Sequence, residues 1–581
     1  AVALRSSPIY FAYQVADFGE YVNRGNVLAG GGPFGGWFVN GFPLVMGESS
    51  LLLGEDRTPY VMPFLGLLVG AAVLATVHLA GAPRAVVAAV AVPFAAHVHA
   101  VWFSQFPASE TLYAALLATS VLLATAALVQ RDHVAAAIGG AFGFLLVVSR
   151  GNGLVYLPVV AVGLALVPVL TDEARSAVLR THLVVLAAGL WLGSVYDARH
   201  NPRYFLDQQA VPRLPGPVAD RFGRLDELRV AAAFTVVVAI GLAAAIGVGL
   251  LLERARRRPG LLRGLRVAAV GVVIAGVVAA HLVVITPESY LPRYEALGAP
   301  VFAAAGLALA VWFADALRDG VSRFLVAWPL LVGTTMATFQ ATRMRKSMSV
   351  DAQWFLYWDR YFFSEAFPML LLAGGVAAGV VLATTSGRAL ARRAVLGSGA
   401  VLVLVWVIDI VPPTRRSGED VMFEDTYEEL AAIDELMPEP QPVIYDGLVE
   451  HPEGWFWANS SRVLGDPLSE TFGRRILNLA AALGPDGRPT PDEIADMLDH
   501  VDAERGYLLQ VRPSDDWEPV DPDLDPEVRG ELAVDIERLE GRSAVRPEDQ
   551  EWITTTLFVR VVEVGAGTGA DGDGAIARSG P

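Results

Sequence analysis

WFSQFPASETLYAALLATSVLL, residues 102–123, is the stretch that says most about the fold of this chain. A short polar turn carrying Glu110 leads directly into an apolar run that continues to residue 129. About 20 consecutive apolar residues are what an α-helix needs to cross the hydrocarbon core of a membrane. The stretch therefore predicts a transmembrane helix over 110–129 with a polar group at its entrance.

Similar runs recur along most of the chain. The 581 residues are 54% hydrophobic and only 18% charged, and the mean hydropathy is +0.45, far above the balance of soluble globular domains. We therefore predict an α-helical polytopic membrane protein with about twelve spans. The predicted spans are 60–81, 84–105, 110–129, 133–149, 152–170, 182–197, 229–252, 266–286, 297–315, 322–339, 362–384 and 395–411.

The arginines predict the orientation of these spans. The links ERARRRPGLLRGLR (253–266) and SGRALARR (386–393) are the richest in arginine, and positively charged loops stay on the cytoplasmic side. Counting outward from them places residues 1–58, the loop at 340–361 and everything after residue 412 outside the cell membrane. The chain starts at AVALRSS without a methionine, so we expect a further segment to precede it.

After Pro412 the apolar runs stop and the composition becomes acidic. Strand patterns at 441–447, 505–511 and 554–564 alternate with helix patterns at 426–436 and 490–501, which predicts an α/β unit. The predicted domains are a first external loop with an acidic motif (1–58), a transmembrane bundle (59–412), an external acidic α/β domain (413–564) and a disordered glycine-rich tail (565–581).

Two carboxylates precede the first visible span, in VADFGEYVNRGN (15–26). In a helix, Asp17 and Glu20 would share one face at positions i and i+3. Such a pair suits a catalytic base, or a grip on sugar hydroxyls or a metal. An acidic pair at a membrane edge is also a common solvated face.

Several motifs, in this order, resemble the GT-C superfamily of integral membrane glycosyltransferases, which use polyprenyl-phosphate-linked sugars, as the dolichyl-phosphate-mannose mannosyltransferases do. The family has an acidic motif in its first outer loop, and its two acids are usually adjacent or alternate, whereas here they are three positions apart. The motifs that carry the resemblance are Asp17 and Glu20, Gly41-Phe42-Pro43-Leu44, Ser109-Glu110-Thr111-Leu112-Tyr113, Ser149-Arg150-Gly151-Asn152-Gly153, and Arg360-Tyr361 before a late span.

The resemblance implies sugar transfer with inversion on the external face, to a glycan, lipid or protein acceptor. Asp17 would be the general base and Glu20 would orient the acceptor. Cations would hold the donor phosphate, because arginine suits phosphate oxygens. The expected substrate-binding residues are Glu110, Arg150, Arg293, Arg343, Arg345, Lys346, Arg360 and Tyr361. For any of the basic residues, a side chain reaching to the membrane interface is the ordinary alternative, and a salt bridge explains Glu110 or Arg150 equally well.

No cofactor is certain from the sequence, which leaves room for a divalent metal, Mg²⁺ or Mn²⁺. The expected partners are the polyprenyl-phosphate sugar donor, membrane lipid and the acceptor, and no motif for nucleic-acid binding is present. Cysteine is absent, which excludes disulfides and thiol chemistry. Two alternatives remain open: a transporter or flippase of lipid-linked saccharides, and a non-catalytic scaffold with a GT-C-like frame.

Overall fold

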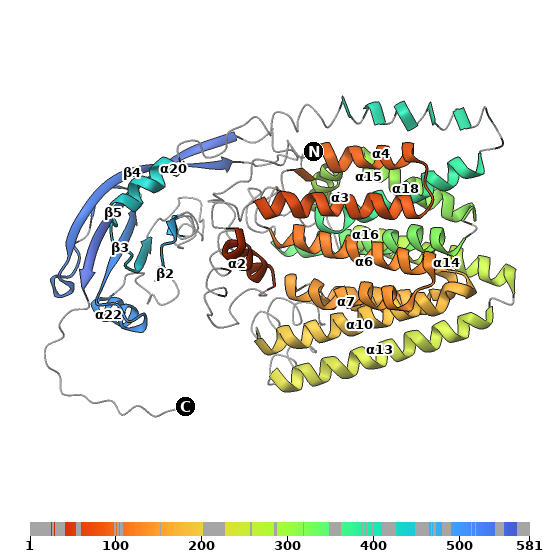
Figure 1. Ribbon diagram of the computed structural model, residues 1–581, viewed down its shortest axis with the longest axis horizontal. Coiled ribbons are helices and arrows are strands. Elements are labelled where there is room, and N and C mark those ends of the chain that lie inside the picture. The colour runs from red at the N-terminus through yellow and green to blue at the C-terminus, as the bar shows by residue number, and fades with distance from the viewer. Residues whose placement is uncertain are drawn as a thin grey trace. The chain divides into compact units, whose positions relative to one another are not determined.

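The protein, described by a computed structural model, forms two compact units. One is a helical bundle within residues 24–420, and the other contains a sheet within residues 421–539 and from residue 552 onwards (Figure 1). The structure describes residues 41–53, 60–97, 100–101, 104, 108–151, 153–200, 227–255, 258–283, 287–317, 319–347, 362–385, 426–447, 472–478, 490–512, 514–517, 519–540 and 551–565, with Gly25, Leu28 and scattered residues in 387–408 and 464–468.

Apolar helices make up the bundle, and all but α2 overlap a predicted span. In chain order they are α2 (Gly41–Leu53), α3 (Val61–Leu79), α4 (Arg84–Ala96), α6 (Ser109–Gln130), α7 (His133–Ser149), α8 (Gly153–Ala165), α9 (Val167–Leu170), α10 (Glu173–His200), α13 (Glu227–Ala255), α14 (Pro259–Val283), α15 (Pro287–Phe313), α16 (Gly320–Ser347) and α18 (Ala366–Thr384).

Seven helices in the described part of the chain are long and apolar enough to cross a membrane. They are α3, α6, α10, α13, α14, α16 and α18, and α4, α7, α8 and α15 contribute shorter apolar segments at predicted positions. The predicted class, a polytopic helical membrane protein with a C-terminal unit that contains strands, is therefore confirmed. The predicted count of about twelve spans is not confirmed.

Two of the departures from the predicted boundaries have a physical reason in the sequence. Helix α16 continues to Ser347, through residues predicted as an external loop, because nothing in ATRMRKS breaks a helix and charged residues are good helix formers. Helix α15 is interrupted at Gly298, whose backbone (φ 77°, ψ 158°) is in a region open essentially only to glycine. Helix α2 lies within the loop predicted for residues 1–58.

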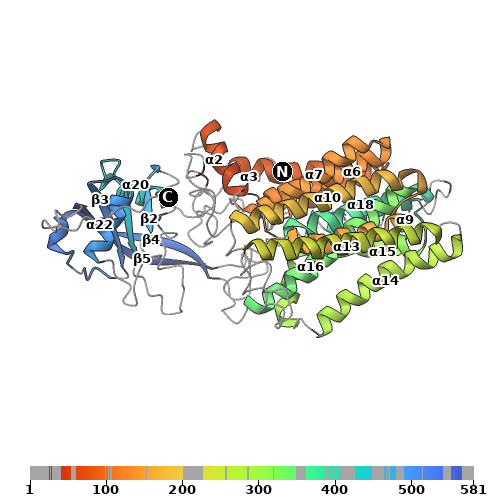
Figure 2. The same ribbon diagram turned by 90° about the horizontal axis from the view of Figure 1, so that it is seen from below.

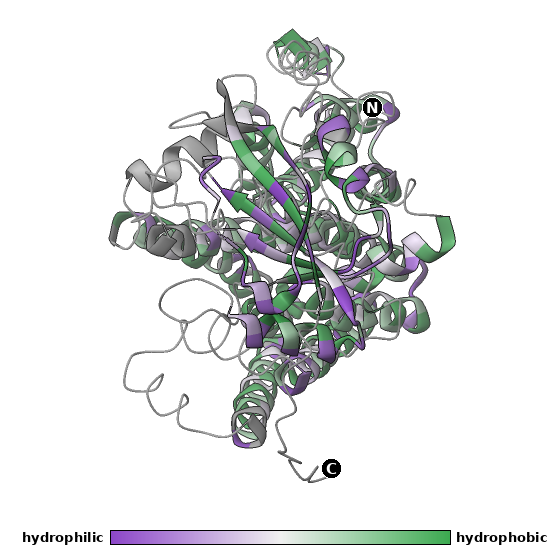
Figure 3. Cartoon of the chain, turned by 90° about the vertical axis from the view of Figure 1, so that its left-hand side faces the viewer, coloured by the Kyte–Doolittle hydropathy of each residue, from purple (hydrophilic) through white to green (hydrophobic). Residues whose placement is uncertain are grey.

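Helix α13 lies along the lower edge of the bundle in Figure 1, and α14 lies along its edge in Figure 2. Within an 18-residue apolar stretch of each helix, 6% of the residues of α13 and none of those of α14 are buried in the protein. Apolar helices with apolar exposed faces are typical of lipid contact. Hydropathy colouring shows the same pattern, since the bundle helices are mostly hydrophobic (Figure 3).

Glycines bring α7 and α10 into close contact. A Cβ on Gly140 would lie 2.6 Å from the carbonyl oxygen of His182, and one on Gly143 would lie 2.5 Å from that of Leu186. From the other side, a Cβ on Gly189 would lie 2.7 Å from the amide nitrogen of Phe144. Small residues at helix contacts are how membrane helices approach closely. The contact holds α7, and therefore the residue that follows it, in a defined position.

The bundle has two chemically different ends. At the end where α6 stops and α7 begins, Asp132 caps α7 by accepting from the amide of Val134 at 2.8 Å. The ion pairs of this end include Asp172 with Arg175 at 2.7 Å. Arg266 pairs with Asp315 at 3.2 Å. Glu253, at the start of the arginine-rich link 253–266, also belongs to this end, because it pairs with Arg180 in the first part of α10.

The second unit is built on a five-stranded sheet of order β2-β1-β3-β5-β4. Strands β1 (Val443–Gly447), β2 (Ile476–Asn478) and β3 (Arg505–Arg512) are parallel, and β5 (Glu551–Gly565) runs antiparallel to β3. Helix α22 (Pro491–His500) begins with the predicted capping box between Thr490 and Glu493. Strand β4 (Glu527–Glu540) and helix α20 (Thr426–Glu435) complete the unit, with a short 3₁₀ turn, η8 (Pro522–Leu524), before β4.

The two helices cover opposite faces of this sheet. Ile494 and Leu498 of α22 pack with Ile444, Leu508 and Val562 in one buried core. On the other face, the hydroxyl of Tyr507 accepts from the amide of Glu439, just beyond α20. The three predicted strands and both predicted helices are present. Strands β2 and β4 were not predicted.

Candidate active site

Three charged side chains meet at the end of the bundle opposite the arginine-rich loops. Glu110 lies in the first turn of α6, Arg150 directly follows α7, and Glu365 directly precedes α18. The backbone of Arg150 is extended (φ −160°, ψ 124°), so α7 ends at the preceding residue, Ser149. This change of direction places Arg150 among the helix ends rather than along the bundle surface.

Arg150 forms ion pairs with both carboxylates. Its Nη2 lies 3.6 Å from Oε1 of Glu110, and its Nη1 lies 3.6 Å from Oε1 of Glu365. The same Nη1 donates to the hydroxyl of Ser364 at 3.1 Å, and that hydroxyl donates to Oε2 of Glu365 at 2.5 Å. We call Glu110, Arg150 and Glu365 the carboxylate cluster.

Tyrosine rings line the cluster on the inner side. The guanidinium carbon of Arg150 lies 5.7 Å from the centroid of the Tyr113 ring, in range for a cation–π contact. Tyr113 follows Glu110 by three positions and so shares its helix face. The Tyr113 and Tyr156 rings meet edge to face, with centroids 6.0 Å apart. These contacts limit the rotation of the arginine side chain.

The carboxylate cluster is almost inaccessible to solvent. The side chains of Glu110, Arg150 and Glu365 are 4%, 7% and 1% exposed. Burying charges in a membrane protein is costly, and such groups are functional-site candidates by default. Two carboxylates face a single guanidinium, so these three groups carry a net negative charge when ionised.

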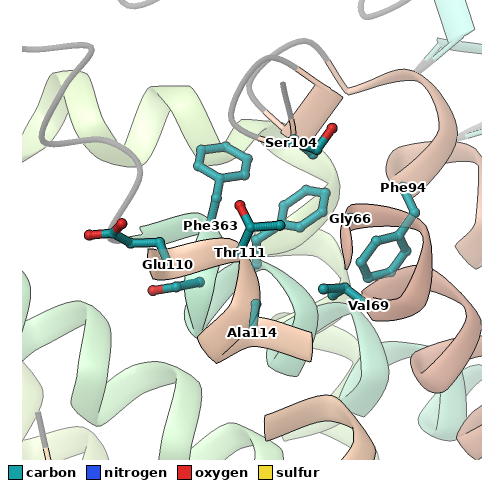
Figure 4. Close-up of a pocket in the computed structure, with 11 residues that line it drawn as sticks. Gly66, Val69, Phe94, Ser104, Glu110, Thr111, Ala114 and Phe363 are labelled. Carbon is teal, nitrogen blue, oxygen red and sulfur yellow. The ribbon is translucent and has the colours of Figure 1, made fainter. Parts of the chain in front are cut away.

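A small cavity of about 40 Å³ adjoins Glu110. It lies between α3, α4 and α6 and the start of α18, and Figure 4 shows the phenyl rings and hydroxyls around it. Its lining includes Ser104, Glu110, Thr111 and Ser364, with Phe94 and Phe363. One water molecule needs about 10–15 Å³ of cavity volume measured in this way, so the cavity accommodates a few small polar groups and not a whole sugar ring.

Helix α2 brings a further motif to this end. A Cβ on Gly41 would overlap the carbonyl oxygen of Val148, two residues before Arg150. Phe42 is fully buried. The Gly-Phe-Pro-Leu motif of residues 41–44 therefore packs against the end of α7, beside the carboxylate cluster.

The structure brings together two of the residues expected from sequence, Glu110 and Arg150, as a buried ion pair. Asp17 and Glu20 lie outside the described residues, and so do Arg360 and Tyr361. Arg293 lies in α15, and the three basic residues 343, 345 and 346 lie near the end of α16; the structure describes their backbone only. The expected roles of all these residues stay predictions.

Sequence reasoning missed Glu365, Ser364, Tyr113 and Tyr156 as members of the site. One signal was present: the dipeptide Ser-Glu stands at the start of α6 and again immediately before α18. Both glutamates face the same arginine in the structure. For a metal, the described residues contain no group of three or more His, Cys, Asp or Glu side chains close enough to bind one.

No protein-family model and no curated protein matches the chain. Among solved structures, it is similar to the oligosaccharyltransferase of Archaeoglobus fulgidus. One structure, with a tethered acceptor peptide, has a TM-score of 0.47 and 10% identity over 84% of this chain and 64% of that one. The other, with zinc and sulfate, has a TM-score of 0.48 and 12% identity over 85% of this chain and 63% of that one.

The chain therefore spans less than two thirds of the length of these structures. Both TM-scores are below 0.5.

Proposed function

We propose that this chain is a GT-C-type membrane glycosyltransferase that transfers a sugar or glycan from a polyprenyl-phosphate-linked donor to a glycan, lipid or protein acceptor. The carboxylate cluster marks the active-site end of the bundle. By the arginine distribution, that end and the sheet unit are extracytoplasmic.

The observation that carries the proposal is the burial of Glu110, Arg150 and Glu365 beside a cavity at one end of an apolar bundle. Taking each of these three charged groups out of water costs several kcal/mol. Such a cost is typical of sites where charge serves binding or chemistry. The cavity next to Glu110 combines phenyl rings with hydroxyls, which suits part of a sugar.

The chemistry follows from the donor. A glycosyl phosphate carries its own leaving group, so the protein has to deprotonate the acceptor hydroxyl and stabilise the departing phosphate. We assign the base to Asp17, on the resemblance to GT-C enzymes, with Glu20 orienting the acceptor. A single displacement inverts the anomeric carbon.

The carboxylate cluster has a positioning role in this scheme. Arg150 holds Glu110 and Glu365 at fixed distances on either side of it, and Glu110 reaches the cavity. Their negative charge favours the positive charge that develops on the sugar ring as the phosphate leaves. The basic residues Arg293, Arg343, Arg345, Lys346 and Arg360 are the proposed partners of the phosphate.

The test is sugar transfer by the purified full chain in nanodiscs, from a panel of radiolabelled polyprenyl-phosphate sugars, with wild type compared with Asp17→Asn. We expect transfer by wild type from at least one donor, and loss of at least a hundredfold in the variant with donor binding retained. Equal transfer by both proteins would move the base elsewhere. Donor binding without transfer by wild type would contradict the proposal and favour the transporter or scaffold.

A matched control for this assay lies at the other end of the bundle. Glu253 pairs with Arg180 on neighbouring helices and is 28% exposed. Glu253→Gln removes one carboxylate of an ion pair, as a site variant does, but at a distance from the cluster. We expect this variant to transfer sugar at the wild-type rate.

A further inference from the structure

The sheet unit contains a second arrangement of polar side chains, at the carboxyl ends of its parallel strands. The chain passes from β1 to β2 on one side and later places β3 on the other side of β1. The gap between β1 and β3 is therefore a topological switch point. In open α/β sheets, ligands bind outside the carboxyl ends of the strands at such a point.

A row of polar residues crosses the sheet there. Asp446 of β1 pairs in register with Gln510 of β3, and Gln510 pairs with Arg560 of β5. Paired residues project from the same face of a sheet, and so do residues two positions apart in a strand. Ile444, Leu508 and Val562 lie two positions from the polar residues on the same three strands, and they pack against α22. The polar residues therefore lie on the face that α22 covers. Apolar packing thus gives way to polar side chains along a single face.

Direct contacts connect the members of this row in two sets, one on β1 and β3 and one on β5 and β4. Arg512 donates to Oδ2 of Asp446 at 2.8 Å, and the amide of Gln510 donates to the same oxygen at 3.3 Å. Arg560 forms an ion pair with Glu531 of β4 at 3.2 Å. We call Asp446, Gln510, Arg512, Arg560 and Glu531 the polar row.

An indole adjoins the row. The guanidinium carbon of Arg560 lies 5.9 Å from the ring centroid of Trp517, in the segment that follows β3. The indole nitrogen of Trp517 and the amide oxygen of Gln510 are both buried, and neither has a hydrogen-bond partner among the described residues. Gln510 as a whole is only 5% exposed. Buried donors and acceptors without partners are rare, and each needs an explanation, such as a bound ligand or water.

The charges of the row limit the class of ligand. Two carboxylates and two guanidinium groups balance each other in pairs, so neither an anion nor a cation gains from the site as a whole. Donors and acceptors nevertheless lie side by side next to a flat aromatic ring. The row is buried at β1 and β3 and opens to solvent at β4, where the side chain of Glu531 is 48% exposed.

We propose that the polar row and Trp517 form a binding site for a neutral carbohydrate. The indole face packs against a sugar ring, its N–H donates to a sugar oxygen, and Gln510 accepts from a sugar hydroxyl. This site lies outside the bundle and does not depend on the proposed transfer activity.

The test is binding of the full chain in nanodiscs to an array of neutral oligosaccharides built from mannose, glucose, galactose, arabinose and N-acetylglucosamine, with sialylated and sulfated glycans beside them. We expect wild type to bind at least one neutral oligosaccharide and Trp517→Ala to weaken that binding at least tenfold. Trp517→Phe keeps a ring but lacks the N–H, so we expect an intermediate loss.

Arg505→Gln is the matched control, because Arg505 pairs with Glu563 on the opposite face of the same sheet. It should bind as wild type does, and thermal unfolding checks that each variant is folded. No binding on the array, binding to anionic glycans alone, or binding unchanged in folded Trp517→Ala would overturn the proposal. Asp17→Asn separates the two sites: it should lose transfer and keep array binding.

Discussion

The two ends of the helical bundle both carry ion pairs, but they differ in burial. At the arginine-rich end, Arg175 and Asp172 are 23% and 27% exposed and pair one to one. At the other end, one arginine that is 7% exposed faces two buried glutamates. Exposed one-to-one pairs end helices and contribute little to stability. A buried cluster of charged groups is costly, and its presence points to a function.

The arginine of the cluster gives the largest expected effect. Arg150→Ala would leave two carboxylates buried next to each other, which costs about 3–5 kcal/mol when one partner of a buried pair is removed. We expect a marked fall in the thermal unfolding temperature of the protein in nanodiscs, followed by tryptophan fluorescence. Arg175→Ala, at the other end, should cost about 0–1 kcal/mol. Equal losses of stability in Arg150→Ala and Arg175→Ala would show that the buried arginine contributes no more to stability than the exposed one.

The helix contact that positions Arg150 gives the next largest effect. Gly140→Ala places a methyl group 2.6 Å from the backbone oxygen of His182, and overpacking of this kind costs about 1–3 kcal/mol. We expect lower thermal stability and a displaced end of α7, with reduced activity. In Gly271→Ala on α14, the added methyl has no atom within 4 Å, and glycine is the poorer helix former. That variant should be as stable as wild type or slightly more stable, and a loss there equal to that of Gly140→Ala would exclude overpacking as the cause.

The smallest expected effect is a loss of stability of the sheet unit at acid pH. Burial raises the pKa of Glu563, but hydrogen bonds from Arg529 and Arg505 outweigh it and hold the pKa below the usual 4.5. A carboxylate with a lowered pKa stabilises the fold above its usual pKa, and this contribution is lost as pH falls through the folded-state value. We therefore expect the sheet unit to lose stability below about pH 4.5.

The comparison that isolates this carboxylate is the Glu563→Gln variant. Because glutamine does not titrate, the fall in unfolding temperature between pH 5 and pH 3 should be smaller in the variant than in wild type. An identical fall in both proteins would assign the acid sensitivity to other groups.

Much of the fold could be predicted from sequence, because span length and apolar composition are local properties. The start of α6 at Ser109 and the capping box of α22 lie within one residue of the prediction. The pairing of Glu110 with Arg150 could not be predicted with certainty, since it depends on how α6 and α7 pack. Glu365 was missed because it follows an aromatic run and reads as part of a helix entrance.

Strand β4 was missed for a different reason. EVRGELAVDIERLE contains seven charged residues among fourteen, so its composition is typical of an exposed segment. Its strand pattern rests on side chains that alternate, with Val534 buried and Asp535 exposed. The polar row was missed with it, because the row exists only when strands distant in sequence come into register.

The central claim is that the carboxylate cluster belongs to the active site. The most direct measurement is the initial rate of sugar transfer by Glu110→Gln and Glu365→Gln, each compared with Glu253→Gln and normalised to folded protein. We predict that the rate falls about a hundredfold or more in the two cluster variants, because a substrate that is no longer held in the reactive position is transferred more slowly. We predict a wild-type rate in Glu253→Gln. Wild-type rates in both folded cluster variants would contradict the account and leave the cluster as a structural ion pair.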